Sequence, residues 1–267
     1  MAEIGFLKES EQQEEAVQVY QVNQETPRNS VVQVYFPAKE KSYAYYNDRF
    51  NLKVGDLVFV EGKLEGCRGR VTEVAYAFKI KLSDYKRVIG KADTRVSGTL
   101  HFCDFYTLAF QKDVIPFEKV RSWLKVPEAA EEFVCGDDEN GFLLEQLETL
   151  DFSYEVAGMG KQYYLSERVC YLSLDGKNGK SIVQGTRFYE VEFTLENGEI
   201  SNVKCSCFCA GMCRHAYAAL LQIREMLKKI TESYTQEFSG YFAALDKELL
   251  IRNVVYQKEA GKITLGN

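Results

Sequence analysis

Histidine, proline and tryptophan are scarce in this chain, which holds two, four and one of them among 267 residues. With so few imidazoles, a catalytic site of the Ser-His-Asp or Cys-His kind has almost no general base to draw on. The spacings of phosphate-binding loops, G-x-x-x-x-G-K-[ST] and G-x-G-x-x-G, are also missing. These absences disfavour an enzyme, and we predict a non-enzymatic protein.

Long apolar stretches are missing too. No run of eighteen apolar residues occurs, so length excludes a membrane-spanning helix. The first fifteen residues are rich in glutamate and lack the basic and apolar regions of a signal peptide. We therefore expect a cytoplasmic protein with no membrane partner. In a reducing compartment, four scattered cysteines are expected to be buried thiols rather than disulfides: Cys67, Cys103, Cys135 and Cys170.

Positive charge is in short supply, since the formal net charge is −6. A protein that coats nucleic acid non-specifically neutralises many phosphates, so this total argues against that mode of binding. The charge is uneven, however. Residues 77–95 carry six Lys or Arg against two acids, whereas 126–160 hold ten acids and no Lys or Arg. Two interpretations stay open, a local basic face or an ordinary solvated surface.

The first third of the chain has a β-rich pattern. After a polar tail over 1–15, short strand-like segments alternate with turns of Gly, Asn and Asp, which predicts a small closed β-barrel over 16–96. The expected strands are 17–22, 31–36, 42–46, 57–60 and 70–76.

One stretch of this region has a recognisable rhythm. Val54-Gly-Asp-Leu-Val-Phe-Val-Glu-Gly62, followed by Gly66-Cys-Arg-Gly-Arg-Val71, loosely resembles SH3-like and KOW-like barrels of nucleic-acid-associated proteins. It is also similar to the DNA-end-binding barrel of primosomal helicases. A barrel without a ligand, or one that binds protein, stays an equal alternative.

The rest of the chain mixes helix and strand patterns, so we predict an α+β fold. Residues 97–154 are expected to form an acidic helical connector, with helices over 117–124, 127–133 and 142–150. Strands are expected over 162–165, 168–174, 180–186, 188–195 and 200–204, with hairpin turns at Asp175-Gly176 and Asn197-Gly198. Residues 233–267 are expected to form a C-terminal extension in which 251–256 pairs with 262–265.

The richest chemistry lies in Cys205-Ser-Cys-Phe-Cys-Ala-Gly-Met-Cys213-Arg-His215, which leads into a helical pattern over 216–230. Thiolate and imidazole at this density form the donor set that tetrahedral zinc requires. Cys205 and Cys207 share one face of a strand because side chains alternate. In a helix, i and i+2 diverge by about 200°, so Cys213 must lie in the irregular turn that enters the helix, where Gly211 supplies conformational freedom.

This spacing, C-x-C, a short loop, C-x-H and then a helix rich in small residues, resembles the SWIM zinc finger, with matching strands upstream; we expect the module over 155–232. The resemblance implies one structural Zn²⁺ held by Cys205, Cys207, Cys213 and His215. Cys209 departs from the family pattern, and we interpret it as a thiol near the site in preference to a ligand. Four protein ligands leave no open coordination position, so the zinc should be structural. We expect zinc binding to contribute on the order of 10 kcal/mol to the folding free energy of residues 155–230.

The resemblance further implies binding to DNA or protein, often alongside chromatin-remodelling-type helicases or transposases. We favour a nucleic-acid-binding module because 156–230 carry ten Lys or Arg against seven acids. An adaptor that docks a partner protein is the alternative, and a thiol oxidoreductase is a third hypothesis because C-x-C can form a disulfide. The candidate nucleic-acid contacts are Lys177, Lys180, Arg187, Lys204 and Arg214.

Overall fold

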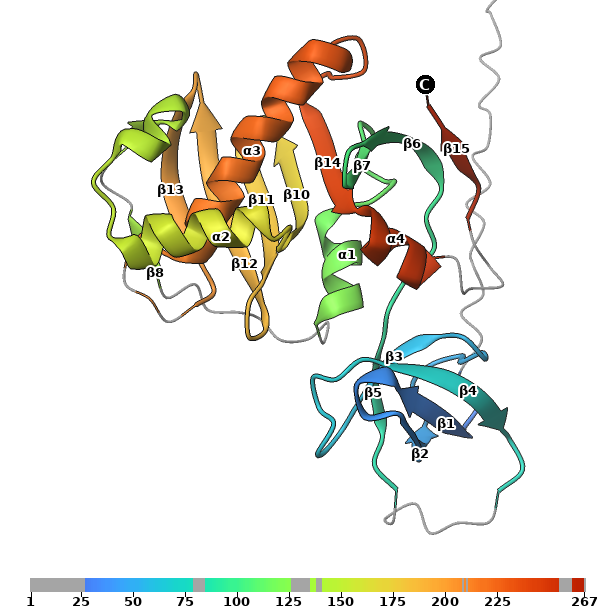
Figure 1. Cartoon of the computed structure of the whole chain (residues 1–267). Helices are drawn as coiled ribbons and strands as arrows, with labels where there is room; N and C mark the ends of the chain where they lie inside the picture. The colour runs from blue at the N-terminus through green and yellow to red at the C-terminus, as the bar shows by residue number, and fades with distance from the viewer. Residues whose placement is uncertain are drawn as a thin grey trace, which may run out of the picture.

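The computed structural model describes residues 27–78, 85–125, 135–137, 141–207, 209, 211–254 and 261–266. The predicted tail over 1–15, the strand over 17–22 and the helix over 127–133 lie outside these residues. Within the described residues the fold is a mixture of helices and strands, as the sequence predicts, arranged around two separate sheets (Figure 1).

The first sheet has five antiparallel strands in the order β2-β1-β4-β3-β5. Alternating valines on β1 put one face in the core and the other toward solvent, and Pro37 ends the strand. A short 3₁₀ turn over Pro37–Lys39 leads into the next strand. The strand bounds are Ser30–Phe36 (β1), Lys41–Asn47 (β2), Leu57–Val60 (β3), Gly69–Ala75 (β4) and Val88–Lys91 (β5).

The closed barrel predicted for 16–96 is not confirmed. Closure needs a continuous ladder between the two edge strands. Among the described residues, the edges β2 and β5 approach one another only through an isolated bridge between Tyr46 and Arg87. Tyr46 N donates to the Lys86 carbonyl at 2.9 Å beside that bridge. The sheet is therefore curled and open.

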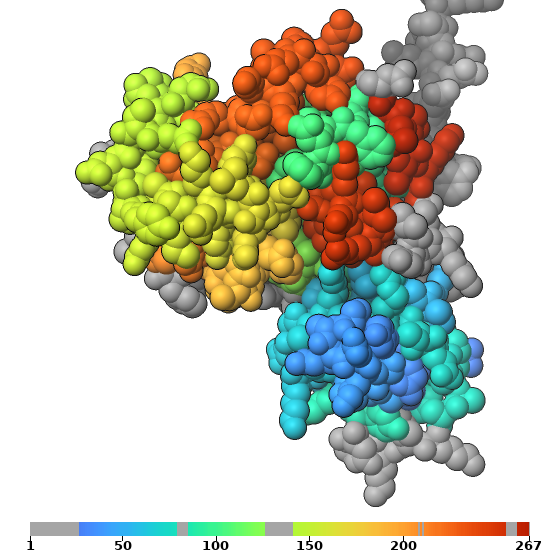
Figure 2. All heavy atoms as spheres, in the orientation of Figure 1, coloured from blue at the N-terminus to red at the C-terminus, as the bar shows by residue number. Residues whose placement is uncertain are grey.

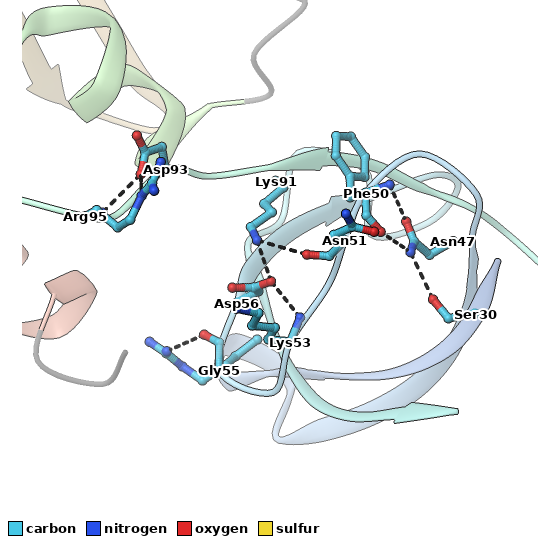
Figure 3. Close-up of polar contacts among 11 residues, drawn as sticks. Ser30, Asn47, Phe50, Asn51, Lys53, Gly55, Asp56, Lys91, Asp93 and Arg95 are labelled. Carbon is cyan, nitrogen blue, oxygen red and sulfur yellow. Dashed lines mark hydrogen bonds and ion pairs between the residues drawn. The ribbon is translucent and has the colours of Figure 1, made fainter. Parts of the chain in front are cut away.

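The loop between β2 and β3 is fixed by buried polar side chains (Figure 3). Asn47, fully buried at the end of β2, donates to the Ser30 hydroxyl at 2.9 Å and to the Phe50 carbonyl at 2.7 Å. Asp56 accepts from the backbone N–H of Lys53 at 2.8 Å and pairs with Lys91 of β5, also at 2.8 Å. These contacts add to the backbone hydrogen bonds that Gly55 and Asp56 exchange with Val71 of β4, at 2.8 and 2.9 Å.

The second sheet follows the order β15-β6-β7-β14-β10-β11-β12-β13-β8, and β9 pairs with β13. Four consecutive strands form two hairpins, β10-β11 and β12-β13, whose turns use Gly176 and Asn197-Gly198 at positive φ, as predicted. The bounds are Gly98–Cys103 (β6), Tyr106–Ala109 (β7), Cys135–Asp137 (β8), Phe142–Leu143 (β9), Val169–Asp175 (β10), Asn178–Gln184 (β11), Phe188–Glu196 (β12), Glu199–Cys205 (β13), Tyr241–Asp246 (β14) and Ile263–Leu265 (β15).

Helices cover both faces of this sheet. Leu172 of β10 packs in the cluster of α3, whereas its neighbour Tyr171 packs in the cluster of α1 with Trp123, and consecutive strand residues point to opposite faces. Figure 1 shows α2 and α3 lying together across the strands. The helix bounds are Phe117–Leu124 (α1), Met159–Leu165 (α2), Arg214–Ser233 (α3) and Lys247–Val254 (α4), with a 3₁₀ helix over Leu144–Thr149 and a π turn over Tyr154–Gly158. In the described chain, every helix is too short or too polar to cross a membrane.

Three element predictions are corrected. The strand expected over 162–165 is part of α2, because its aromatic side chains pack on α3 rather than on a neighbouring strand. The strand expected over 251–256 falls largely on α4, so the closing hairpin does not form, and β15 instead pairs with β6 in parallel. The helix expected over 142–150 is a 3₁₀ helix only over Leu144–Thr149, and it follows the short strand β9.

The first sheet lies below the second one in the view of Figures 1 and 2, and the two share buried side chains. Leu57 and Ala92 of the first unit lie in the same buried cluster as Trp123. Arg68 donates to the Trp123 carbonyl at 3.0 Å and to the Asn253 side chain at 3.1 Å. Burial, the largest effect, together with the neighbouring Arg70 lowers the pKa of Arg68. The domain boundaries at 96, 154 and 232 stay a prediction.

Candidate metal centre

The β12-β13 hairpin delivers the first pair of donor side chains. Cys205 is the last residue of β13 and pairs with Val191, and it is fully buried. Cys207 follows two residues later and is 3 % exposed. The tight turn at Asn197-Gly198 sets the register at the tip of the hairpin, and an irregularity between Glu192 and Thr194 shifts it by one residue before Cys205.

The start of α3 delivers the second pair. Cys213 is the N-cap of the helix, with φ −124° and ψ 167°, and its Sγ accepts from the Ala216 N–H at 3.5 Å. His215 lies in the first turn and is 2 % exposed. Gly211 has φ +69°, which lets the chain turn into the helix. The predicted entry of Cys213 through an irregular turn is confirmed.

The four side chains converge. One donor atom from each of Cys205, Cys207, Cys213 and His215 lies within 4.8 Å of all the others, and all four residues are buried. His215 Nδ1 lies 3.9 Å from the Cys205 Sγ and 3.8 Å from the Cys213 Sγ. With Zn–S of about 2.3 Å and Zn–N of about 2.0 Å, the edges of a tetrahedral site measure about 3.5–3.8 Å. The cluster therefore suits one zinc ion.

The surroundings of the cluster favour a cation. Burial alone lowers the pKa of His215, but contacts with the Cys207 and Cys213 thiols outweigh it and hold that pKa above its ordinary value. The ring thus faces sulfurs that stabilise positive charge. At the N-terminus of α3, a helix of 20 residues, the Ala216 N–H is directed at the Cys213 sulfur.

Aromatic rings hold the imidazole in place. Tyr189 of β12 stacks on His215 with centroids 4.1 Å apart and an interplanar angle of 21°, and Tyr163 of α2 meets it edge-on at 5.5 Å. His215 Nε2 is buried and has no hydrogen-bond partner among the described residues. A Cβ added to Gly185, in the turn before β12, would lie 3.1 Å from this Nε2 and 2.7 Å from the Tyr189 ring.

Gly185→Ala is expected to destabilise the fold by about 1–3 kcal/mol, the usual cost of overpacking, because the two stacked rings cannot both move away. Chemical unfolding monitored by circular dichroism measures this change. The neighbouring exposed residue supplies the control, and Gln184→Ala should stay within about 0.5 kcal/mol of the parent. An alanine variant at 185 as stable as the parent would show that the turn does not press on the imidazole.

Three arginines lie over the two tyrosines that contact His215, Tyr189 and Tyr163. Arg187 lies over Tyr189 at 5.2 Å, and Arg168 and Arg214 lie over Tyr163 at 4.8 and 5.7 Å. Arg187 and Arg214 belong to the predicted nucleic-acid contacts. Arg168 is not among the predicted contacts. It precedes Arg214 by more than forty residues, and only the packing of α2 against α3 brings both arginines to Tyr163.

The three predicted lysines lie on or beside strands of the second sheet. Lys177 sits in the β10-β11 turn and pairs with Glu196 at 3.4 Å. Lys180 pairs with Glu192 at 3.1 Å on the adjacent strand, and Lys204 is the register partner of the same glutamate. Lys177 and Lys180 are therefore paired with carboxylates. All five residues stay predicted nucleic-acid contacts.

Cys209 is exposed and is not one of the four converging side chains. The other histidine, His101, is buried in the second sheet, with ring contacts to Phe110 at 5.4 Å and Tyr234 at 5.6 Å. Neither residue joins the cluster.

Comparison with known proteins identifies the segment that carries the cluster. Residues 189–224 match the family model of the SWIM zinc finger. The matched residues run from β12 through the hairpin and into α3, so they include all four converging donors. The resemblance inferred from the cysteine and histidine spacing is confirmed for this part of the chain. No curated protein and no solved structure matches the chain.

Proposed function

The chain contains a SWIM zinc finger, and from this premise we propose that it is a non-enzymatic module that binds DNA through the arginines around its metal centre. Cys205, Cys207, Cys213 and His215 would hold one Zn²⁺, which supplies structural cross-linking between β13 and α3. The SWIM zinc finger is a family of binding modules. Four protein donors also fill a tetrahedral shell and leave no position for a substrate.

The single observation that supports this proposal is the set of cation–aromatic contacts built on the metal ligand itself. Arg187 stacks on Tyr189 and Tyr189 stacks on His215, so the position of this guanidinium depends on the same imidazole that the zinc site needs. Guanidinium groups held on aromatic rings are pre-ordered for phosphate oxygens. Arg214 lies in the first turn of α3, where the helix dipole also favours an anion.

The proposal also covers the partners and the cellular compartment that the family resemblance suggests. Helicase-type or transposase-type proteins are the expected partners, and the cytoplasm is the expected compartment, because reducing conditions preserve the thiolates that bind zinc.

A fluorescence-anisotropy titration with labelled single- and double-stranded oligonucleotides tests the proposal. Three arginine–phosphate contacts predict a salt slope of about −2.7 on duplex DNA, so affinity should fall roughly 40-fold between 50 and 200 mM salt. Arg187→Gln and Arg214→Gln should each weaken binding and reduce the slope by about one. Each variant must first be shown to retain one zinc per chain.

Arg252→Gln is the matched control, since it removes an exposed arginine on α4 that is not one of the candidate contacts. It should leave affinity and salt slope unchanged. The proposal is wrong if the zinc-loaded protein binds neither oligonucleotide at 50 mM salt, or if Arg252→Gln loses as much affinity as the variants at 187 and 214.

A further inference from the structure

A second surface, distant in sequence from the metal ligands, is formed where the β6-β7 turn meets α2 and α3. Figure 2 shows the face on which the β6-β7 segment (green), α2 (yellow) and α3 (orange) lie together. A cavity of about 170 Å³ opens there. Its walls include Phe105 from the turn, Leu165 from the end of α2 and Met226 from α3.

The size of the cavity limits its occupant. Small-molecule sites usually measure about 300–1,000 Å³, which is well above this volume. A cavity of about 150 Å³ accepts a benzene ring. The pocket therefore suits one aliphatic or aromatic side chain.

The floor of the cavity is fixed. Met226 is 1 % exposed, and the buried Gln222 accepts at its Oε1 from the Tyr106 hydroxyl at 3.1 Å. That hydroxyl also lies 2.7 Å from the Val169 carbonyl, to which it donates. A hydrogen-bonded floor of this kind keeps its shape without an occupant.

Large apolar side chains on the two sides of the cavity mouth, here called its lips, are exposed to solvent. Phe105 is 58 % exposed and Leu165 is 66 % exposed. The lips are shaped by two non-glycine residues in the left-handed region, Asp104 with φ +47° and Glu167 with φ +55°. Such conformations are costly for these residue types. Exposed apolar side chains on either side of a preformed cavity mark a surface that a partner covers.

The charged residues at the rim of the cavity indicate the chemistry of that partner. Asp104, Glu167 and Glu225 contribute three negative charges. Lys229 is the cation among the lining residues, and it is already paired with Asp104 and lies 3.7 Å from Glu225. The lining residues are therefore net negative, which repels phosphate and favours a basic occupant.

We propose that this cavity docks a short peptide segment of a partner protein, with one apolar side chain inside it and an Arg or Lys beside that side chain. The apolar residue is covered by Phe105 and Leu165, and the basic residue faces Glu167 and Glu225. The surface gives the chain a protein contact in addition to the DNA binding proposed for its metal centre. Charge complementarity and the one-side-chain volume are the observations that select a peptide.

A phage-displayed library of random seven-residue peptides, selected on the zinc-loaded full chain, tests the proposal. Selected peptides should share an apolar residue next to Arg or Lys. Their affinity for Leu165→Ser and for Phe105→Ser should be about tenfold or more weaker, the effect of leaving one large side chain uncovered. Both residues are exposed, so both variants should fold, and zinc content and circular dichroism verify this.

Ile251→Ser is the matched control, because Ile251 is 54 % exposed on α4 and is not one of the residues lining the cavity. It should bind the selected peptides as the parent does. Glu225→Gln should weaken only peptides that carry the basic residue. Failure of the library to enrich any sequence, equal binding by the serine variants at 105 and 165, or displacement of the peptides by a single-stranded oligonucleotide would each overturn the proposal.

Discussion

Removal of zinc is expected to cost this protein on the order of 10 kcal/mol of folding free energy, as structural zinc does in small modules. The total stability of a domain is about 5–15 kcal/mol, so the second sheet and α3 should melt at a much lower temperature after chelation. The reason is geometric. The cluster joins the end of β13 to the first turn of α3, and without a cation it leaves buried thiols facing a buried imidazole.

Elemental analysis before and after treatment with a chelator, paired with far-UV circular dichroism melts, measures this effect. One zinc per chain is expected before treatment. Cys213→Ala should reproduce the effect of the chelator because it removes one of four donors. Cys67→Ala should bind zinc normally, since Cys67 is half-buried in the first unit and outside the cluster. An unchanged melting curve after complete loss of metal would contradict the prediction.

Glu190→Ala is expected to destabilise the fold by about 3–5 kcal/mol, the usual cost of breaking a buried ion pair. Glu190 of β12 accepts from Arg121 at 2.7 Å and Lys125 at 3.0 Å, and all three side chains are at most 12 % exposed. This carboxylate therefore connects α1, on one face of the sheet, to the strand that supports the metal centre.

The same residue is connected to the metal-binding segment through its backbone. Ser206, between the first two cysteines of the cluster, donates its N–H to the Glu190 carbonyl at 2.9 Å, and its hydroxyl accepts from Glu190 N–H, also at 2.9 Å. Loss of the carboxylate should therefore also weaken zinc binding, which competition with a chromophoric chelator can measure.

Glu192→Ala provides the comparison within one strand. Glu192 pairs with Lys180 at 3.1 Å, but both side chains are more than a third exposed, so the pair should contribute only about 0–1 kcal/mol. Both variants lose one negative charge, so the difference between their free energies of unfolding in urea measures the effect of burial. Equal losses of unfolding free energy in Glu190→Ala and Glu192→Ala would show that burial of the Glu190 ion pairs adds nothing to stability.

Local sequence was enough to predict the metal-binding segment. The C-x-C and C-x-H pairs are only a few residues apart, and the side-chain period of a strand and the geometry of a helix start dictate how each pair points. The hairpin turns at Gly176 and at Asn197-Gly198 were equally predictable, because their backbone needs positive φ.

Longer-range pairing escaped prediction for a physical reason. β14, followed by α4, lies in the middle of the second sheet between β7 and β10, although it is distant from both in sequence. Patterns in a single strand do not identify its neighbours. In the same way, the 162–165 segment has an aromatic composition that suits a strand, and its packing on α3 makes it a helix.

The amino-acid sequence by itself determined that this protein carries four metal-binding side chains and which secondary elements hold them, because those effects act over a few residues. Only the tertiary structure decided that Arg168 joins Arg187 and Arg214 around the metal centre, that Lys177 and Lys180 pair with carboxylates, and that an acidic cavity opens between α2, α3 and the β6-β7 turn. Each of those arrangements depends on contacts between residues far apart in the chain, which the burial of shared apolar surface selects.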